Sequence, residues 1–377
     1  MNDRNAKIRN ILVPVLSVIL GLVIGAIIMA AFGFNPVIGY QSMLNASLGN
    51  LRSIGETLRQ ATPLIFTALG FSIANSAGFF NIGLSGQALC GWLASVSLAL
   101  VFPDLPKVIL LPLCIIAGAL AGALAAAVPG VLRAYFGTSE VIVTIMMNYI
   151  VLYLSTFILQ GVMPESFRSS LDSSNRITEN ASLSMDSLSR FFGGSRVNAG
   201  LFLALFGLVV VWFIMKKTTL GYEIRAVGLN PNASEYAGMS SKRTIILSMV
   251  LSGTFAGLGG VVEGLGTYQN FFVQTESLSI GFDGLAVSLL GAGSSIGILL
   301  AALLFSILQI GGLGMQTGAG VPFEIVNVVI ALIIFFVAIS YIMRVLLAKI
   351  MPDKRKEEVV QNLESTSGNQ DGKGGGL

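Results

Sequence analysis

The segment FNIGLSGQ, Phe80–Gln87, is the first part of the chain whose side chains could do chemistry. Around it, uncharged hydrogen-bonding residues alternate with glycines: Asn75, Ser76, Asn81, Ser85 and Gln87. The segment interrupts a long apolar run, and broken helix at membrane depth is tolerated only where it is buried in protein or lines a wet cavity. We therefore expect a pathway for a neutral polar solute lined by Asn75, Asn81, Ser85 and Gln87. The alternative is a tight polar turn with helix-packing glycines.

A second polar group lies on a predicted apolar helix over Val141–Val162. Glu140, Thr144 and Asn148 are spaced i, i+4, i+8 and therefore share one helix face. We expect Thr144 and Asn148 on the same solute pathway; contact with a neighbouring helix is the alternative. Glu140 stands at the start of the helix, where a carboxylate stabilises the N-terminal dipole.

The longest hydrophilic stretch between two apolar runs on the inner side is Lys216–Arg243. Asn230 suits a helix N-cap, Pro231 the first helical position and Gly238 the stop, which predicts a helix of about two turns. Asn232 with Glu235 offers an alternative start that resembles a capping box. A short rigid helix here is suited to docking a partner protein, and an ordered loop is the alternative.

Such a helix would present Ala233, Tyr236 and Ala237 as a small apolar face bordered by Glu235. An apolar helix face of this kind can enter a groove on a partner, with the aromatic residue as its anchor.

Other kinds of chemistry are excluded by what the sequence lacks. The chain has no His, so His-based metal sites, proton relays and Ser-His catalysis are absent. Cys90 and Cys114 lie in apolar runs, as packing residues do. No GxxxxGK[ST] phosphate-binding pattern occurs. We expect no catalytic residue, no metal and no cofactor; the chain is not an enzyme, and any ATP would be hydrolysed on another subunit.

Three acids could in principle couple transport to an ion gradient: Glu263, Asp283 and Glu324. All lie near the predicted outer ends of apolar runs, where water can solvate them. We expect interfacial charges there. This expectation counts against a proton-coupled or sodium-coupled mechanism and against a charged substrate.

The composition indicates which elements position these residues. Charged residues make up 11% of the 377 residues, against about 25% in a soluble domain, and apolar types make up 54%. The net charge of +3 is small, and no nucleic-acid partner is expected. The chain is predicted to be an all-α, multi-pass protein in contact with membrane lipid, with ten transmembrane helices.

The expected spans follow the apolar runs, each about 20 residues long where it crosses alone. The charge-free run Ala61–Phe102 would extend about 63 Å as one helix and must therefore hold two spans, joined at Phe80–Gln87. Ile280–Ile310 is interrupted at Gly291–Ser295, which predicts two short helices. An amphipathic interfacial helix is expected over Leu48–Leu58. The remaining single spans are Ile11–Phe32, Val108–Val131, Val141–Val162, Leu201–Met215, Thr244–Gly266 and Ile325–Leu347.

The placement of Lys and Arg predicts the topology. With the N-terminus inside, 15 of the 22 Lys+Arg fall on inner segments and 7 on outer ones, so both termini are expected in the cytoplasm. The expected parts are a cytoplasmic N-terminus, a transmembrane domain containing an extracytoplasmic loop and a cytoplasmic coupling segment, and a polar, disordered cytoplasmic tail. The N-terminus covers residues 1–10, the transmembrane domain 11–347, its extracytoplasmic loop 163–198, its coupling segment 216–243, and the tail 348–377.

Over roughly residues 10–345 the chain resembles the permease subunits of bacterial ABC importers for simple sugars and nucleosides. This family lies in the branched-chain-type permease superfamily, and the nucleoside branch fits best. One departure is Ser85, where many relatives carry Glu, which puts an ionic role there in doubt. The resemblance is carried by FNIGLSGQ (80–87), TSEVIVTIMMNYI (138–150), LGYEIRAVGLNPNASEYAGM (220–239) and GLAVSLLGAGSSIGILLAALLFSILQIGG (284–312).

The resemblance implies a location in the cytoplasmic membrane and three kinds of partner. These are a second, non-identical permease subunit, a cytoplasmic ABC ATPase, and an extracytoplasmic substrate-binding protein, which is a lipoprotein in some relatives. It also implies that the segment 216–243 seats in the ATPase. The residues expected to couple there are Arg225, Asn230, Glu235, Tyr236 and Gly238.

The function expected from the sequence is ATP-driven import of a neutral polar solute, with nucleosides favoured over simple sugars. An ion-coupled secondary transporter is the alternative from another class. It should carry an ionisable group at mid-membrane and inverted repeats, and neither is evident in the sequence.

Overall fold

The computed structural model describes residues 18–338, which fold mainly as helices in two compact units. The predicted N-terminal segment 1–10 and tail 348–377 lie outside the described residues. In the smaller unit, a helix over Val18–Ala31 packs against α14 (Phe323–Ala338). Gly21 permits this contact, because a Cβ there would lie 2.7 Å from the Cα of Ile333.

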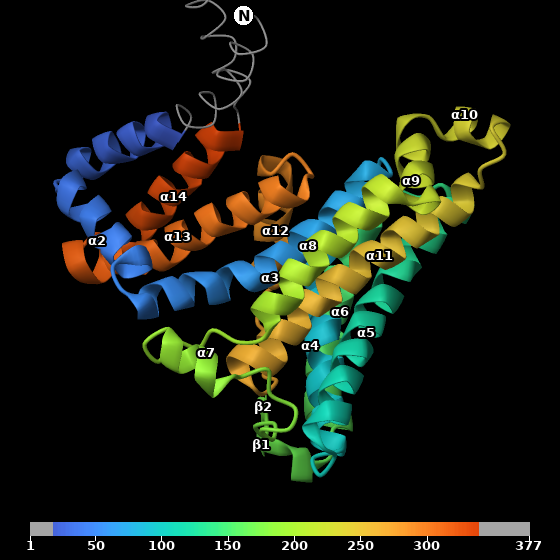
Figure 1. Ribbon diagram of the computed structural model, residues 1–377, viewed down its shortest axis with the longest axis horizontal. Coiled ribbons are helices and arrows are strands. Elements are labelled where there is room, and N and C mark those ends of the chain that lie inside the picture. Colours follow the sequence, from blue (N-terminus) through green and yellow to red (C-terminus); the bar gives the residue numbers. More distant parts are fainter. Residues whose placement is uncertain (1–17, 339–377) are drawn as a thin grey trace, which may run out of the picture. The chain divides into compact units, whose positions relative to one another are not determined.

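The larger unit, Val37–Phe323, holds the remaining elements (Figure 1). Between α6 and α8, a short two-stranded hairpin and α7 form most of the predicted outer segment, and π-helical turns extend α6 and α11. The elements are α2 (Pro36–Leu48), α3 (Leu51–Ser76), α4 (Leu84–Val101), α5 (Lys107–Phe136), α6 (Glu140–Phe157), η1 (Ile158–Val162), η2 (Glu165–Phe167), β1 (Arg168–Ser170), β2 (Ser173–Ser174), α7 (Asp186–Phe191), α8 (Gly200–Lys217), α9 (Thr219–Leu229), α10 (Pro231–Tyr236), α11 (Ser241–Val261), η3 (Val262–Tyr268), α12 (Ser279–Leu290) and α13 (Ser295–Ala319).

Helix α11 is the centre of this unit and packs against α3, α4 and α5. Small residues bring its backbone close to α5. A Cβ on Gly253 would lie 2.3 Å from the carbonyl oxygen of Gly122, and one on Gly257 2.5 Å from that of Gly118. The paired GxxxG spacing therefore allows direct backbone contact, as in many helix pairs that pack within membranes.

The predicted fold class, a mainly helical membrane protein, is confirmed. Within residues 18–338, six helices are long and apolar enough to cross a membrane: Leu84–Val101, Lys107–Phe136, Glu140–Val162, Gly200–Lys217, Ser241–Tyr268 and Ser295–Ala319. Val18–Ala31, Ser279–Leu290 and Phe323–Phe336 are shorter apolar helices. The count of ten spans and the cytoplasmic position of both termini stay predictions.

Both predicted interruptions of long apolar runs are present. Helix α3 ends at Ser76 and α4 begins at Leu84, so the first run contains a turn over residues 77–83, and the second half of the predicted segment, Leu84–Gln87, is the first turn of α4. In the second, α12 ends at Leu290 and α13 starts at Ser295, with Ala292 at φ 51° and Gly293 at φ 64° between them. Only α12 is short as predicted, because α13 continues for 25 residues. The separate amphipathic helix expected over Leu48–Leu58 is wrong: from Leu51 these residues form the first turns of α3, because no breaker separates them from the apolar run.

Helix α12 is too short to span a membrane, since its 12 residues extend about 18 Å. Hydrogen bonds fix both of its ends. Ser85 Oγ donates to the carbonyl of Leu278 (2.8 Å), Thr67 Oγ1 to that of Ile280 (2.8 Å), and Ser72 Oγ to that of Gly293 (2.9 Å). The chain after η3 therefore enters the bundle as the non-helical segment 269–278 and becomes helical only beside α3 and α4.

Candidate functional site

The predicted pathway residues gather at the turn between α3 and α4. Asn81 is fully buried, and its amide and that of Gln87 exchange two hydrogen bonds, of 3.0 and 3.1 Å. The Asn81 side chain also donates to Ser252 Oγ on α11 (2.9 Å) and accepts from the backbone N–H of Gly83 (2.9 Å). The two amides therefore satisfy one another and stabilise the turn against the central helix.

Helix α6 holds the same turn from the other side. Asn148, 3% exposed, accepts from the Gly86 N–H (2.8 Å) and donates to the carbonyl of Ile82 (3.0 Å). Thr144 Oγ1 accepts from the Ile82 N–H (3.3 Å). Glu140 stands in the first turn of α6, as expected, and also pairs with Arg133 at 3.4 Å.

Two predicted pathway residues lie apart from this network. Ser85 anchors the start of α12, and Asn75 is exposed near the end of α3. Among the six, Asn148 also lines a cavity within residues 37–323 that is described next. A role in solute passage stays a prediction for all six, and the structure adds that four of them stabilise the turn.

Two cavities flank the segment that precedes α12. One, of about 330 Å3, is lined by Glu263, Trp92 and Tyr268, and the other, of about 520 Å3, by Asn148, Tyr149 and Asp283. Both are also lined by Thr275, Glu276, Ser277 and Ser279. Three of the four side chains that line both cavities are uncharged hydroxyls, which suit weak binding of a neutral solute, and the fourth is the Glu276 carboxylate.

The acids near these cavities differ from expectation. Asp283 accepts a hydrogen bond from Gln309 (2.9 Å), which itself accepts from Gln60 (2.9 Å), so an amide chain links α3, α13 and α12. The expectation of a solvated Glu263 is wrong, because this residue is only 6% exposed. It lies on the π-helical end of α11, which is packed against α4 rather than open to solvent.

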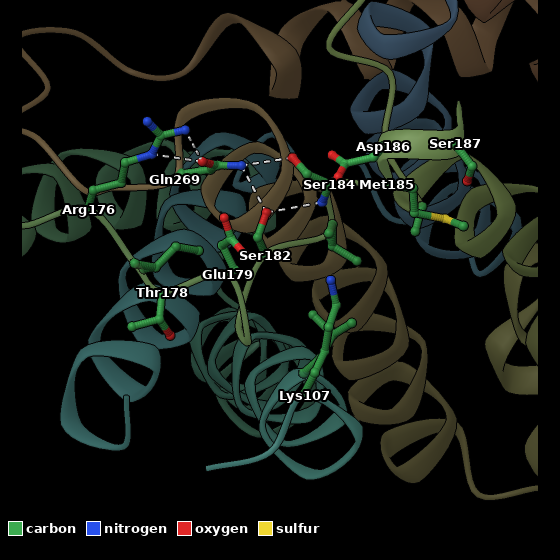
Figure 2. Close-up of a pocket in the computed structure, with 14 residues that line it drawn as sticks. Lys107, Arg176, Thr178, Glu179, Ser182, Ser184, Met185, Asp186, Ser187 and Gln269 are labelled. Atoms are coloured by element: carbon green, nitrogen blue, oxygen red, sulfur yellow. Dashed lines mark hydrogen bonds between the residues drawn. The ribbon is translucent and has the colours of Figure 1, made fainter. Parts of the chain in front are cut away.

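The outer segment is hydrogen-bonded to the chain that leads into the cavities. The N–H of Leu183 donates to the carbonyl of Leu265 (3.0 Å), and the N–H of Ser174 to that of Phe271 (2.7 Å). A cavity of about 1070 Å3 lies on this segment. Figure 2 shows Arg176 donating to Gln269, whose own amide donates to Ser182 and Ser184.

At the opposite end of the larger unit, the segment 216–243 forms two helices, α9 and α10 (Figure 1). Asn230 caps α10 by accepting from the Ala233 N–H (3.1 Å), Pro231 is the first helical residue, and Gly238 follows the helix at φ 85°. The predicted short helix is confirmed with its cap at Asn230 rather than Asn232. Helix α9 is not among the predicted helices, although Thr218 caps it by accepting from the Gly221 N–H (3.2 Å).

The predicted coupling residues project from this segment. Tyr236 is 95% exposed, and Arg225 and Glu235 are exposed as well. Ser234 is the buried residue of α10, and Ser241, the first residue of α11, donates to the carbonyl of Pro231 (3.0 Å), which fixes α10 on the start of α11. The helix is therefore fixed at its N-terminal end while its aromatic side chain is exposed.

Helix α9 connects this segment to the turn. A Cβ on Gly228 would lie 2.2 Å from the carbonyl oxygen of Ser76 and 2.9 Å from the carbonyl carbon of Ala77. Backbone therefore packs directly on backbone where α3 ends. Helix α9 therefore contacts the chain where the turn that contains Asn81 begins.

The chain is similar to several known permeases. It is 52% identical over 355 residues to the nucleoside ABC transporter permease protein NupB of Lactococcus lactis, which covers 94% of this chain and 97% of NupB. It is 44% identical to the guanosine ABC transporter permease protein NupP of Bacillus subtilis, over 91% of this chain and 97% of NupP. The glucose ABC transporter permease protein TsgB13 of Haloferax volcanii is 34% identical over 87% of each chain.

A more distant relative is a second L. lactis protein, the nucleoside ABC transporter permease protein NupC, 28% identical over 67% of this chain and 80% of NupC. No solved structure matches the chain. The family described as branched-chain amino acid transport system / permease component matches residues 53–338. The chain belongs to this family of permease components, and the resemblance noted from its motifs is confirmed.

Proposed function

We propose that this chain is the permease subunit of an ATP-driven ABC importer that carries nucleosides across the cytoplasmic membrane. The observation that carries the proposal is the 52% identity to a nucleoside ABC transporter permease over nearly the full length of both chains. The two cavities beside segment 274–279 support it, because a nucleoside is neutral and rich in hydrogen-bonding groups. The lower identity to a glucose permease keeps simple sugars as the second candidate.

The ATPase is proposed to dock on the coupling segment, with Arg225, Asn230, Glu235, Tyr236 and Gly238 as its contact and cap residues. The exposed ring of Tyr236 on a capped helix supports this role. Helix α9 would pass a movement of the ATPase to the end of α3 through Gly228. This placement puts α9 and α10 in the cytoplasm and the hairpin and α7 outside.

A second, non-identical permease is proposed to close the pathway. The cavities beside segment 274–279 are open in this subunit, and a solute path must be shielded from lipid by protein on every side. L. lactis has two nucleoside permease proteins, NupB and NupC, that both resemble this chain, which supports pairing of unlike subunits. Other faces contact lipid; Val108 and Leu124 of α5, for example, are exposed and apolar.

The extracytoplasmic binding protein is proposed to dock on the outer segment. Its cavity of about 1070 Å3 presents Lys107, Arg176, Glu179 and Asp186 for ion pairs. The hydrogen bonds from this segment to Leu265 and Phe271 connect docking to the cavities. A solute released there would pass Thr275 and Ser277 and then Asn148. Asn81, Gln87 and Thr144 would position the turn, Ser85 would hold the start of α12, and Asn75 would lie at the inner exit.

Uptake by cells tests which solute the transporter carries. Deleting this permease from its host is expected to reduce the initial uptake of tritiated guanosine and uridine at least 10-fold while leaving glucose uptake unchanged. Expression of the chain from a plasmid should restore nucleoside uptake. Loss of glucose uptake with normal nucleoside uptake would favour the sugar alternative instead.

A further inference from the structure

Glu263 is a buried acid with an unsatisfied carboxyl oxygen. Among residues 18–338, no group meets hydrogen-bond geometry at its Oε2 atom or at Thr267 Oγ1, and Thr267, one turn further along η3, is the polar side chain beside Glu263. The buried cation Arg59 is paired with Glu56 at 2.7 Å. A buried polar atom without a partner is costly, and it marks a place where a bound group can satisfy it.

The Glu263 side chain lines the cavity of about 330 Å3, which lies at the lower end of the range for small-molecule sites. Tyr268 lines the same cavity. One face of its ring stacks on Trp92, with centroids 5.0 Å apart and planes at 13°, yet the residue stays 47% exposed. Trp92 is itself fixed by its indole N–H, which donates to the carbonyl of Asn270 (2.8 Å). The cavity therefore combines a fixed aromatic surface with a carboxylate acceptor.

Accepting the proposed function, we infer that Glu263 and Tyr268 form a recognition site for the base of the transported nucleoside. The base stacks on Tyr268, because every base offers a π-face to an aromatic ring. The Glu263 carboxylate accepts hydrogen bonds from neighbouring N–H groups of the base. The ribose extends toward Thr275 and Ser277, which line both this cavity and the adjoining one.

This chemistry favours guanine-type bases. Guanine presents a ring N–H and an exocyclic amino group side by side, so that one carboxylate accepts from both. Adenine presents a ring nitrogen acceptor beside its amino group, and this nitrogen would face the carboxylate with like charge density. Glu263 therefore selects guanosine over adenosine inside the permease, independently of any selection by the binding protein.

The test compares Glu263→Gln with wild type in the deletion strain. The matched control is Glu165→Gln, the same change at an exposed residue of η2. Initial uptake rates of labelled guanosine, 2′-deoxyguanosine, adenosine and uridine are measured. In Glu263→Gln, the ratio of guanosine to adenosine uptake should fall about 10-fold, the change expected for loss of a hydrogen bond to a charged group. Deoxyguanosine should follow guanosine, and Glu165→Gln should match wild type.

Several outcomes would overturn the inference. An equal fall for all four solutes would assign Glu263 to folding or ion coupling, and a fall for ribonucleosides without deoxyguanosine would assign it to the ribose. No nucleoside uptake by wild type would instead refute the proposed function. If Glu263→Gln fails to assemble, the test compares Tyr268→Leu with Tyr268→Phe. Uptake of every nucleoside should fall in Tyr268→Leu and persist in Tyr268→Phe. Equal uptake by the two variants would contradict the site.

Discussion

Replacing Tyr236 by Ala is expected to abolish nucleoside uptake while the permease still inserts and folds. The ring is 95% exposed on α10, so its removal leaves no cavity in this chain. As the anchor of a helix in a groove, it should contribute about 2 kcal/mol or more to ATPase binding. The measurement is co-purification of the ATPase with the variant, together with guanosine uptake by the same cells.

The control for Tyr236→Ala is Phe191→Ala, which removes an exposed aromatic from α7 at the other end of the larger unit. This control should retain the bound ATPase. Wild-type levels of both ATPase and uptake in Tyr236→Ala would show that α10 is a passive segment and that the ATPase docks elsewhere.

Substituting Ala for Gly228 should uncouple ATP hydrolysis from transport. The added methyl group would lie 2.2 Å from the Ser76 carbonyl oxygen, so α9 must move away from the end of α3. Overpacking of this kind costs about 1–3 kcal/mol, whereas Gly to Ala in an unobstructed helix stabilises. We expect the ATPase to remain bound and active while uptake falls about 10-fold or more, since backbone contact at the turn is lost.

Gly161→Ala is the matched control, because its Cβ would meet only the Phe157 ring, at 3.4 Å. The assay measures ATP hydrolysed per guanosine imported. An unchanged ratio in Gly228→Ala would mean that movement does not pass from α9 to α3.

Local signals made part of this structure predictable. The cap at Asn230, the proline after it and Gly238 define α10 within a few residues, and the helix forms where they predict. The break at Gly291–Ser295 was also foreseen, because glycines adopt the left-handed conformation that interrupts a helix. In each case the residues that decide the structure are neighbours in the sequence.

The remainder depends on contacts between distant segments. The sequence predicts Asn81 and Gln87 as solute-binding amides. Their spacing does not indicate that Asn81 pairs instead with Gln87 and with Ser252. The sequence predicts a solvated Glu263 because this residue stands near the end of an apolar run. The packing of η3 against α4 buries it instead, and a periodic pattern does not reveal which neighbour covers a residue. The one feature of the sequence that could have pointed to the Glu263 site is a lone acid near the end of an apolar run.

The most direct test of the central claim is uptake by the purified transporter in proteoliposomes. The chain is reconstituted with the second permease and the ATPase, the binding protein loaded with tritiated guanosine is supplied outside, and ATP is enclosed with the ATPase domains. We predict accumulation that requires ATP and the binding protein and is insensitive to ionophores. Accumulation by this chain alone, driven by a proton or sodium gradient without ATP, would contradict the account.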